Sequence, residues 1–440
     1  MTTVNTALVH YEQAITDLFN RRPEVMVPGL RRIRALVHSM GEPQRAYAAI
    51  HLTGTNGKTS TARMITSLLL AAGEQVGTYT SPHLQDVRER FRIDGAPLAV
   101  DDLLAGLDAL GPHIERVEQA TGEMVTFFEA STALCLWAFA RARVTTGVIE
   151  VGMGGRFDAT NVVDAGVAVI GRVQLDHPQL GATVGEVAWE KAGIIADGAT
   201  VISANTEGPP AHVVAEEVAA RGASLRMVDR DFGVVARRLT PSGQCISLRG
   251  LDARTFTVDL PLHGAHQAAN AACALAAVQA HVGHPLNPAV VRAGFAGVRS
   301  PGRLELLSTD DGTPVLLDGA HNPAAARVLA RSLRELHGDR RRVAVLGVMA
   351  DKDLPAMVGL LGTVVDEVVV TEPDSPRAAT VDQLADVCHA AGLPVIAAVP
   401  DVGDAVRLAA RRTGTHGMVV VTGSLYTVGD ARAVLGGMPD

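Results

Sequence analysis

A short apolar run, a glycine-rich turn and a helix-forming stretch follow one another near residue 50, and this succession constrains the fold most strongly. The run YAAIHL (47–52) suits a buried strand. The stretch ARMITSLLLAAG (62–73) has a helical pattern and closes on Gly73. A strand that passes through a short turn into a helix is the repeating unit of parallel α/β sheets. The sequence therefore predicts an α/β fold with a doubly wound parallel sheet.

The alternation of strands and helices continues beyond this unit. Two more buried strands are predicted at 145–151 and 167–173, followed by a β-rich stretch over 232–262. Helical patterns are predicted at 5–20, 29–40, 101–119, 126–143, 266–281 and 288–296. We expect these elements to form one large N-terminal domain over residues 1–298.

A second alternation begins after RSPGR (299–303), where Pro and Gly separate two patterns. Beyond it, four helical patterns separate the apolar runs PVLLDGA, RRVAVLGVMA, DEVVVTE, LPVIAA and GMVVVTGS. This alternation predicts a smaller, Rossmann-like C-terminal domain over 299–440.

Composition argues against several classes of protein. The chain has 39 Lys and Arg against 47 Asp and Glu, a net charge of −8, whereas proteins that wrap duplex nucleic acid normally carry a basic excess. No apolar run is long enough for a membrane span, and the first residues do not resemble a signal peptide. The four cysteines are far apart and form no C-x-x-C pair, which fits a reducing cytoplasm.

The glycine-rich turn has the residues of a phosphate-binding loop. It lies between a strand and a helix, so its backbone N–H groups and the helix N-terminus are available to a polyphosphate. Lys58 would reach the outer phosphates, and Thr59 a metal or a phosphate oxygen. The strict P-loop has a glycine where this chain has Leu52. The loop residues are Gly54, Thr55, Asn56, Gly57, Lys58, Thr59 and Ser60.

Polar residues follow two of the predicted strands. Glu150 ends one strand, and Asp176 and His177 follow the next. Ligands gather at the carboxyl ends of strands in parallel sheets, and hard carboxylate oxygens suit Mg²⁺. We therefore expect a metal site beside the phosphate loop.

Ten motifs in a fixed order give the chain a family resemblance. They are IHLTGTNGKTSTA, TSPHL…ERFRIDG, TFFE, VIEVGMGGRFDATN, LDH…EKAGI, LPLHGAHQAANAACALAA, SPGRLE, DGAHNPAA, DKD and VTGSLY. Together they resemble the folylpolyglutamate synthase/dihydrofolate synthase family of the Mur ligase superfamily, over about residues 45–426.

The resemblance implies an ATP-dependent amide ligase that adds L-glutamate to dihydropteroate, to reduced folates or to both. A substrate carboxylate takes the γ-phosphoryl group of ATP, and glutamate then displaces phosphate from the acyl phosphate. The resemblance also implies two Mg²⁺ ions, room for a monovalent cation and a monomer in the cytoplasm. Its partners would be small molecules, with no nucleic acid and no membrane.

The family's functional residues transfer to this sequence position by position. Ser81, Glu150 and His177 match its first Mg²⁺ site, and Lys191 matches a lysine that becomes carbamylated and supports the second ion. Lys191 by itself would be interpreted as a helix-surface lysine. The ATP contacts implied by the resemblance are Asn270, Arg303, Asp318 and His321, besides the phosphate loop. The pterin contacts are Thr126, Phe128 and Asp158, and Ser424 lies near the expected glutamate site. The catalytic set is Lys58, Lys191 and His321.

Other interpretations stay open at this point. The loop carries GKT where the family usually has GKG, and only Pro178 and Gln179 separate Asp-His from Leu-Gly, one residue fewer than usual. A specialised Mur-type ligase acting on another acid is therefore the alternative. A GTPase-like switch would carry N-K-x-D after a strand, and this sequence has none. The charged run at 88–92 is interpreted as a solvated hairpin in preference to an attractor of an anionic folate tail.

Overall fold

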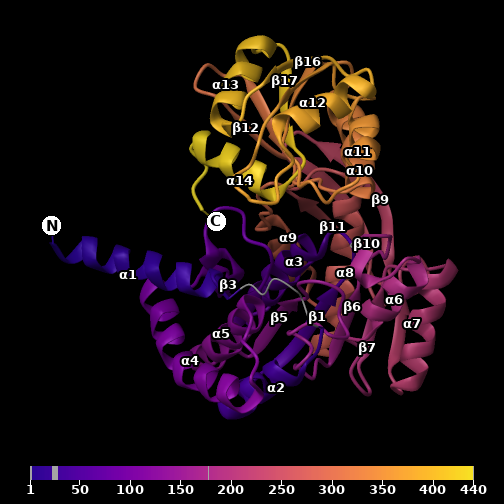
Figure 1. Ribbon diagram of the computed structural model, residues 1–440. Helices are drawn as coiled ribbons and strands as arrows, with labels where there is room; N and C mark the ends of the chain where they lie inside the picture. The colour runs from indigo at the N-terminus through magenta and orange to yellow at the C-terminus, as the bar shows by residue number, and fades with distance from the viewer. Residues whose placement is uncertain (1, 22–27, 177, 440) are drawn as a thin grey trace.

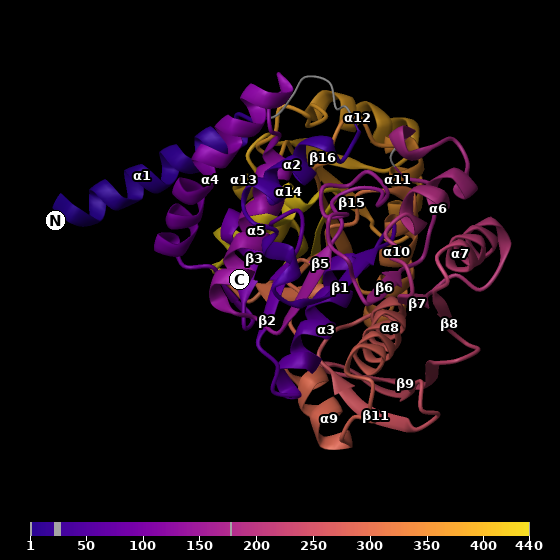
Figure 2. The ribbon, with the colours of Figure 1, turned by 90° about the horizontal axis from the view of Figure 1, so that it is seen from below.

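The computed structural model describes residues 2–21, 28–176 and 178–439, and it confirms the predicted fold class. Figure 1 shows the C-terminal domain above a larger N-terminal domain, and Figure 2 shows the molecule from below. Within the described part of the chain, no helix combines the length and apolar character needed to cross a bilayer.

The N-terminal domain is built on an eight-stranded sheet that is parallel except at one edge. In spatial order its strands are β4 (Ala96–Pro97), β3 (Phe91–Ile93), β2 (Val76–Tyr79), β5 (Thr146–Glu150), β1 (Ala48–Thr53), β6 (Val167–Ile170), β7 (Thr200–Ser203) and β8 (Ser224–Met227). Strands β1, β5 and β6 match the predicted runs, so the alternation read from the sequence is confirmed for the centre of the sheet.

Helices cover both faces of this sheet because successive strand residues point to opposite sides. Val167 and Val169 pack into one core with α3 (Lys58–Ala71), α8 (Ala265–Val282) and α9 (Pro288–Ala296). Ala168 and Ile170 face the other way, toward α6 (Val184–Ala192) and α7 (Gly208–Ala220). The second face is completed by α1 (Thr2–Phe19), α2 (Arg31–Ser39), α4 (Val100–Thr121) and α5 (Phe127–Ala142).

A small antiparallel sheet accounts for the predicted β-rich stretch. Its strands are β9 (Gly233–Thr240), β10 (Gly243–Arg249) and β11 (Thr255–Leu260), and it packs on α8 and α9. Figure 2 shows this sheet beside α8 and α9.

The C-terminal domain has a mixed six-stranded sheet. In spatial order its strands are β12 (Glu305–Ser308), β13 (Pro314–Leu317), β17 (Met418–Thr422), β14 (Arg342–Leu346), β15 (Glu367–Val370) and β16 (Val395–Ala398). Only β12 is antiparallel. One face carries α10 (Pro323–His337), α11 (Leu354–Leu361) and α12 (Val381–Ala390), and the other carries α13 (Val402–Thr413) and α14 (Leu425–Val434). The five predicted strands are all present.

The charged run at 88–92 is not a solvated hairpin, so that interpretation is wrong. Glu89, Arg90 and Arg92 are buried. The Arg90 Nε donates to His83 Nδ1 at 2.9 Å, and the Arg92 Nε donates to the Gly95 carbonyl at 3.0 Å. Part of this run forms the short 3₁₀ helix η2 (Val87–Arg90). The described residues also form the 3₁₀ helices η1 (Pro43–Arg45) and η3 (Pro178–Leu180).

Candidate active site

The phosphate loop lies between β1 and α3, as the sequence predicts, and two lysines converge on it. The Lys58 Nζ donates to the Gly54 carbonyl at 3.1 Å. The Lys191 Nζ, which comes from α6, donates to the same carbonyl at 3.0 Å. The Gly54 carbonyl therefore accepts hydrogen bonds from two lysines.

Gly57 has a conformation and a neighbour that only glycine allows. Its φ is +84°, and a Cβ there would lie 2.8 Å from the Asn270 Oδ1. Asn270 of α8 thus packs directly on the loop. Its Nδ2 donates to the Gln267 Oε1 at 3.1 Å, and the Gln267 Nε2 donates to the Ser60 Oγ at 3.2 Å. This chain of polar contacts fixes the loop against α8.

Glu150 ends β5 with a fully buried carboxylate. The Thr59 hydroxyl donates to its two oxygens at 3.0 and 2.9 Å, and the Ser81 N–H lies 3.4 Å from Oε2. Burial raises the pKa of Glu150 to about 7, while Lys58 and these donors oppose the rise. A buried carboxylate beside the Thr59 hydroxyl is a hard-oxygen donor set that fits Mg²⁺.

The third predicted ligand of that metal site, His177, lies outside the described residues. Among the residues that are described, no three His, Cys, Asp or Glu side chains gather as a complete ligand set.

Lys191 is buried, so its interpretation as a helix-surface lysine is wrong. Burial and, to a smaller extent, the nearby Lys58 lower the pKa of its ammonium to about 7, while Asp176 and Asp158 act in the opposite direction. A lysine in this environment has a substantial neutral fraction near pH 7, and the neutral amine is able to act as a nucleophile.

Asp176 joins the two domains beside Lys191. Its carboxylate lies 3.7 Å from the Lys352 Nζ, and it accepts a hydrogen bond from the Asn322 Nδ2 at 3.3 Å. The same Asn322 nitrogen donates to the Asn56 side chain of the phosphate loop at 3.3 Å. Both Asn322 and Lys352 belong to the C-terminal domain, so this domain contacts the loop directly.

The predicted C-terminal contacts lie together at the end of β13. Asp318 accepts the N–H groups of Leu304 and Ala320, each at 3.0 Å. Burial raises the Asp318 pKa, which Arg303 opposes. His321 bonds the Gly319 carbonyl at 2.8 Å through Nδ1, and burial lowers the pKa of its ring to about 4. His321 is therefore neutral at pH 7.

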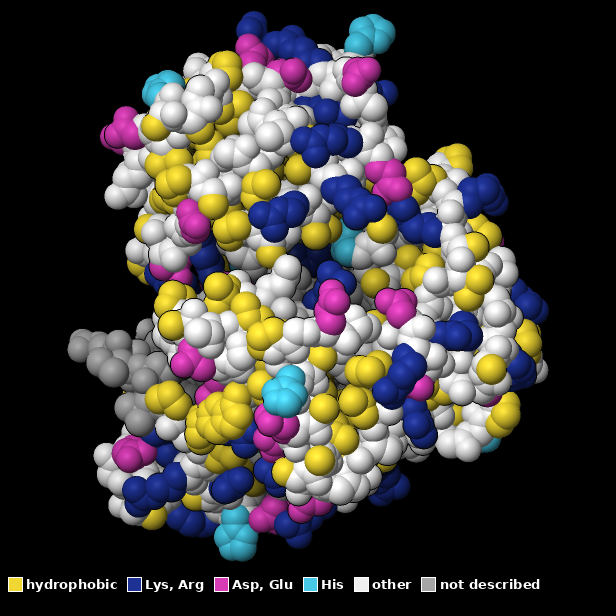
Figure 3. All heavy atoms as spheres, turned by 90° about the vertical axis from the view of Figure 1, so that its right-hand side faces the viewer, with side chains coloured by type: hydrophobic (Ala, Val, Ile, Leu, Met, Phe, Trp, Pro, Cys, Tyr) yellow, Lys and Arg dark blue, Asp and Glu magenta, His cyan; other side chains and the backbone are white. Residues whose placement is uncertain are grey.

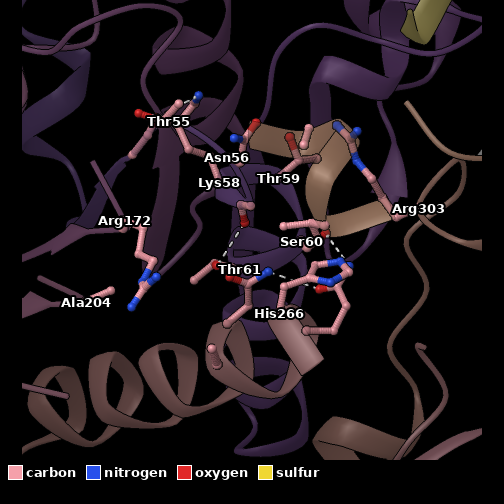
Figure 4. A pocket seen from close by; sticks show the side chains of 18 of the residues that line it. Thr55, Asn56, Lys58, Thr59, Ser60, Thr61, Arg172, Ala204, His266 and Arg303 are labelled. Atoms are coloured by element: carbon pink, nitrogen blue, oxygen red, sulfur yellow. Dashed lines mark hydrogen bonds between the residues drawn. The ribbon is translucent and has the colours of Figure 1, made fainter. Parts of the chain in front are cut away.

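One cavity of about 550 Å³ unites these groups. Figure 3 shows Lys and Arg side chains around the hollow between the domains, and Figure 4 shows Arg303 and Arg172 flanking the phosphate loop from opposite sides. The predicted site residues that line it are Gly54, Thr55, Asn56, Gly57, Lys58, Thr59, Ser60, Ser81, Glu150, Lys191, Asn270, Arg303, Asp318 and His321.

The predicted pterin and glutamate contacts do not line this cavity. Thr126 is the N-cap of α5 in a capping box, and Ser424 is the N-cap of α14. Asp158 accepts the Met153 N–H at 2.9 Å and the Thr160 hydroxyl at 2.6 Å. Phe128 packs against Gly152, next to Met153, so Phe128 and Asp158 contact the same short segment.

Sequence reasoning missed three residues at the site: Arg172, Asn322 and Lys352. Arg172 follows the strand β6 at the same sheet edge as Glu150, and that position was the available signal. Asn322 precedes a proline at the start of α10, a pattern typical of an N-cap, and its side chain accepts the Ala325 N–H at 2.8 Å. Lys352 lies in the DKD motif, which was the available signal, but its partner Asp176 is far away in the sequence.

Comparison with known proteins gives the site its context. A family model described as the Mur ligase middle domain matches residues 52–278, and one described as the Mur ligase, glutamate ligase domain matches 302–425. The dihydrofolate synthase/folylpolyglutamate synthase of Mycobacterium tuberculosis is 41% identical over 464 aligned positions, covering 96% of this chain and 93% of that protein.

Solved structures agree with the sequence comparison. The Mycobacterium tuberculosis folylpolyglutamate synthase complexed with ADP has a TM-score of 0.93 at 38% identity, covering 99% of this chain and all of that one (100%). The E. coli protein FolC in complex with DHPP and ADP has a TM-score of 0.83 at 30% identity, covering 97% of both chains. The resemblance read from the motifs is confirmed: the chain belongs to the dihydrofolate synthase/folylpolyglutamate synthase family of Mur ligases.

Proposed function

We propose that this protein is an ATP-dependent ligase that joins L-glutamate to the carboxyl group of a pteroate or folate. The observation that carries the proposal is the single cavity in which the phosphate loop, Glu150 and Lys191 meet Arg303 and His321 of the other domain. The names of the relatives and the ADP and DHPP bound to solved neighbours support it.

ATP would bind with its phosphates on the loop at 54–60 and its base toward α8. The His266 Nδ1 is buried in this cavity and has no hydrogen-bond partner among the described residues, which supports a polar ligand there. Asn270 lies one helical turn further on and lines the same wall. Asp318 is the proposed ribose contact.

Glu150, Thr59 and Ser81 would hold a first Mg²⁺, together with His177. When bound, the ion would neutralise charge on the phosphoryl group that is transferred. Lys58 and Arg303 reach the same region and would stabilise that charge from two sides. A monovalent cation is a further proposed cofactor, which substitution of choline for K⁺ in the assay would test.

Lys191 would carry a carbamate. Its neutral amine adds to CO₂ and releases one proton, so a neutral group becomes an anion beside Lys58. The depressed pKa of the amine and the proximity of Lys58 support this modification. The carbamate would support a second Mg²⁺.

The reaction would proceed in two transfers. A substrate carboxylate oxygen attacks the γ-phosphorus of ATP and displaces ADP, which leaves an acyl phosphate. The glutamate nitrogen then attacks the acyl carbon, and phosphate departs with the former carboxylate oxygen. Enclosure between the domains would exclude water, to which an acyl phosphate is sensitive.

The acid and amino-acid sites are proposed outside the main cavity. Thr126, Phe128 and Asp158 would hold the pterin, since an aromatic face and a carboxylate suit its ring and its amino edge. Ser424 would lie near glutamate. We also propose that the domains divide at 298/299, which the two separate large sheets support, and that the protein acts as a cytoplasmic monomer.

Phosphate release tests the proposal. The protein should release phosphate from ATP rapidly only when both glutamate and an acid from a panel of dihydropteroate and reduced folates are present. Lys58→Ala should lower the rate about 10²–10⁴-fold while the circular dichroism spectrum stays unchanged. Release that is independent of glutamate, or extension of an unrelated acid alone, would refute the proposal and favour a specialised ligase.

A further inference from the structure

The segment 81–86 belongs to the N-terminal domain but contacts the C-terminal domain as well. At its start, the Ser81 N–H faces the Glu150 carboxylate. Three residues later, the Leu84 side chain packs against the apolar core between the C-terminal sheet and helices α13 and α14. One short segment thus contacts both the candidate metal site and the other domain.

The close packing of Leu84 against helix α14 depends on a glycine. Gly429 lies within α14, and a Cβ at this position would lie 2.1 Å from the Leu84 carbonyl oxygen, far inside contact distance. Gly302 forms another wall, where a Cβ would lie 3.5 Å from both Leu84 Cδ atoms. The backbone of the segment can approach α14 this closely only because residue 429 has no side chain.

The segment is also held in shape from within. The Glu89 carboxylate accepts the backbone N–H groups of Leu84 at 2.7 Å, and of Gln85 and Asp86 at 3.1 Å each. Glu89 is buried, so these three bonds are shielded from water. A displacement of Leu84 is therefore transmitted along the segment.

A polar contact secures the same junction. The Gln85 Nε2 donates to the Gly437 carbonyl at 3.0 Å, and the Gln85 side-chain oxygen accepts from Arg432 of α14. Arg432 in turn pairs with Glu305 of β12 at 3.1 Å, with both side chains largely buried. Apolar and polar contacts thus attach the segment to the C-terminal domain.

We infer that Leu84, seated against Gly429, is a positioning residue that holds Ser81 against Glu150 when the C-terminal domain is in place. The inference rests on the proposed ligase activity. In this account, a contact that lies away from the phosphate loop determines where Ser81 lies in the candidate metal site. Leu84 itself touches no reacting atom in this account.

The test uses a matched pair of alanine substitutions. Gly429→Ala adds a methyl group that must displace the segment, whereas Gly359→Ala adds one in helix α11 of the same domain, where nothing lies within 4 Å. Gly429→Ala should lower kcat about 10- to 100-fold, the scale of a misplacement of about 1 Å. The KM for ATP and the affinity for ADP should stay within about twofold, because the loop at 54–60 is untouched. Gly359→Ala should behave like the unchanged protein.

Hydrogen–deuterium exchange of the amides at 84–86 supplies a readout independent of activity. Exchange should be faster in Gly429→Ala than in Gly359→Ala because the bonds to Glu89 open more often. Unchanged kcat overturns the inference, and so does a lower kcat with unchanged exchange. If the wild-type protein forms no glutamyl product, the proposed function fails. In that case, equal exchange in the two variants would separately refute the role of the contact between Leu84 and Gly429.

Substitution of Leu84 provides a second test. Leu84→Ala should lower kcat in the same way. Leu84→Met should keep most of the wild-type kcat, because its side chain has a similar volume and fills the same space. The double variant Leu84→Ala/Gly429→Ala should be no slower than the slower single variant, since both changes disable one contact. Losses that multiply would contradict the inference.

Discussion

Glu150 is a carboxylate that the folded protein buries at a cost in stability. Burial raises its pKa from an ordinary value of 4.5 to about 7, so the folded protein keeps the proton at pH values where the unfolded chain has released it. The destabilisation is therefore absent below pH 4.5, grows as the pH rises, and is complete above pH 7. Such an arrangement is typical of a site that receives a cation.

Glu150→Gln should accordingly stabilise the metal-free protein in a pH-dependent way. The free energy of unfolding should rise by about 2–3 kcal/mol at about pH 8 and change little at about pH 5, because Gln mimics the protonated carboxyl group. Urea unfolding at both pH values measures the effect. The same variant should need much more Mg²⁺ for ligation. An equal change in stability at both pH values would contradict the role of the buried charge.

Lys191 shows how far a local pattern can mislead. Its position on α6 gives no sign of burial, since the helix is short and moderately polar. Its environment comes from the phosphate loop, to which it is joined by the Gly54 carbonyl. The carbamate proposal predicts a carbon-13 carbamate signal after incubation with labelled bicarbonate, strongest above about pH 7, where the amine is neutral. Lys191→Arg should lack this signal, and its persistence would place the carbamate elsewhere.

At the scale of elements, the segment after β5 combines folding and recognition. Asp158 accepts hydrogen bonds that shape this segment, so Asp158→Ala removes both the proposed pterin contact and internal bonds. Use of dihydropteroate should fall about 30- to 1000-fold, or about 2–4 kcal/mol, with little change in ATP affinity. The exposed Asp164→Ala is the control and should keep full activity. Undiminished use of dihydropteroate by Asp158→Ala would remove Asp158 from the pterin site.

Asn322, the N-cap of helix α10, makes two kinds of contact. Asn322 caps the helix through Oδ1 and contacts Asn56 and Asp176 through Nδ2. Asn322→Asp keeps the cap but loses the donor and places a second carboxylate beside Asp176. Turnover should fall about tenfold or more while the thermal midpoint changes by only a few degrees.

Asn287→Asp is the matched control for this prediction. Asn287 also caps a helix that starts with proline, but it is exposed, and its side chain accepts only the Ala289 N–H at 2.9 Å among the contacts of the described residues. This variant should be fully active. Equal activity of the two aspartate variants would show that the contact between Asn322 and the loop is dispensable.

At the scale of the whole molecule, the sequence predicted the elements whose signal is local. The central strands β1, β5 and β6 are continuous apolar runs, and the five parallel strands of the C-terminal sheet are equally clear. The short strands β2, β7, β8 and β12 were not predicted. Each mixes polar and apolar residues over four positions, so pairing with neighbouring strands rather than a local pattern defines it.

The same distinction applies to the site. Motifs identified the residues that line the cavity, because the phosphate loop and the strand ends have characteristic local sequences. Contacts between domains were invisible, since Asp176 meets Lys352 and Leu84 meets Gly429 only after both domains have folded and packed. Arg90 and Arg92 are likewise buried by tertiary packing, although the run that contains them is hydrophilic.

Transfer of oxygen from substrate to phosphate tests the central claim most directly. The protein is incubated with ATP, glutamate and dihydropteroate or a reduced folate whose reacting carboxylate carries oxygen-18. Mass spectrometry should find a product extended by one glutamate and phosphate that contains one labelled oxygen, because the acyl phosphate returns the carboxylate oxygen to phosphate. Unlabelled phosphate, or labelled substrate recovered without a glutamyl product, would contradict ligation through an acyl phosphate.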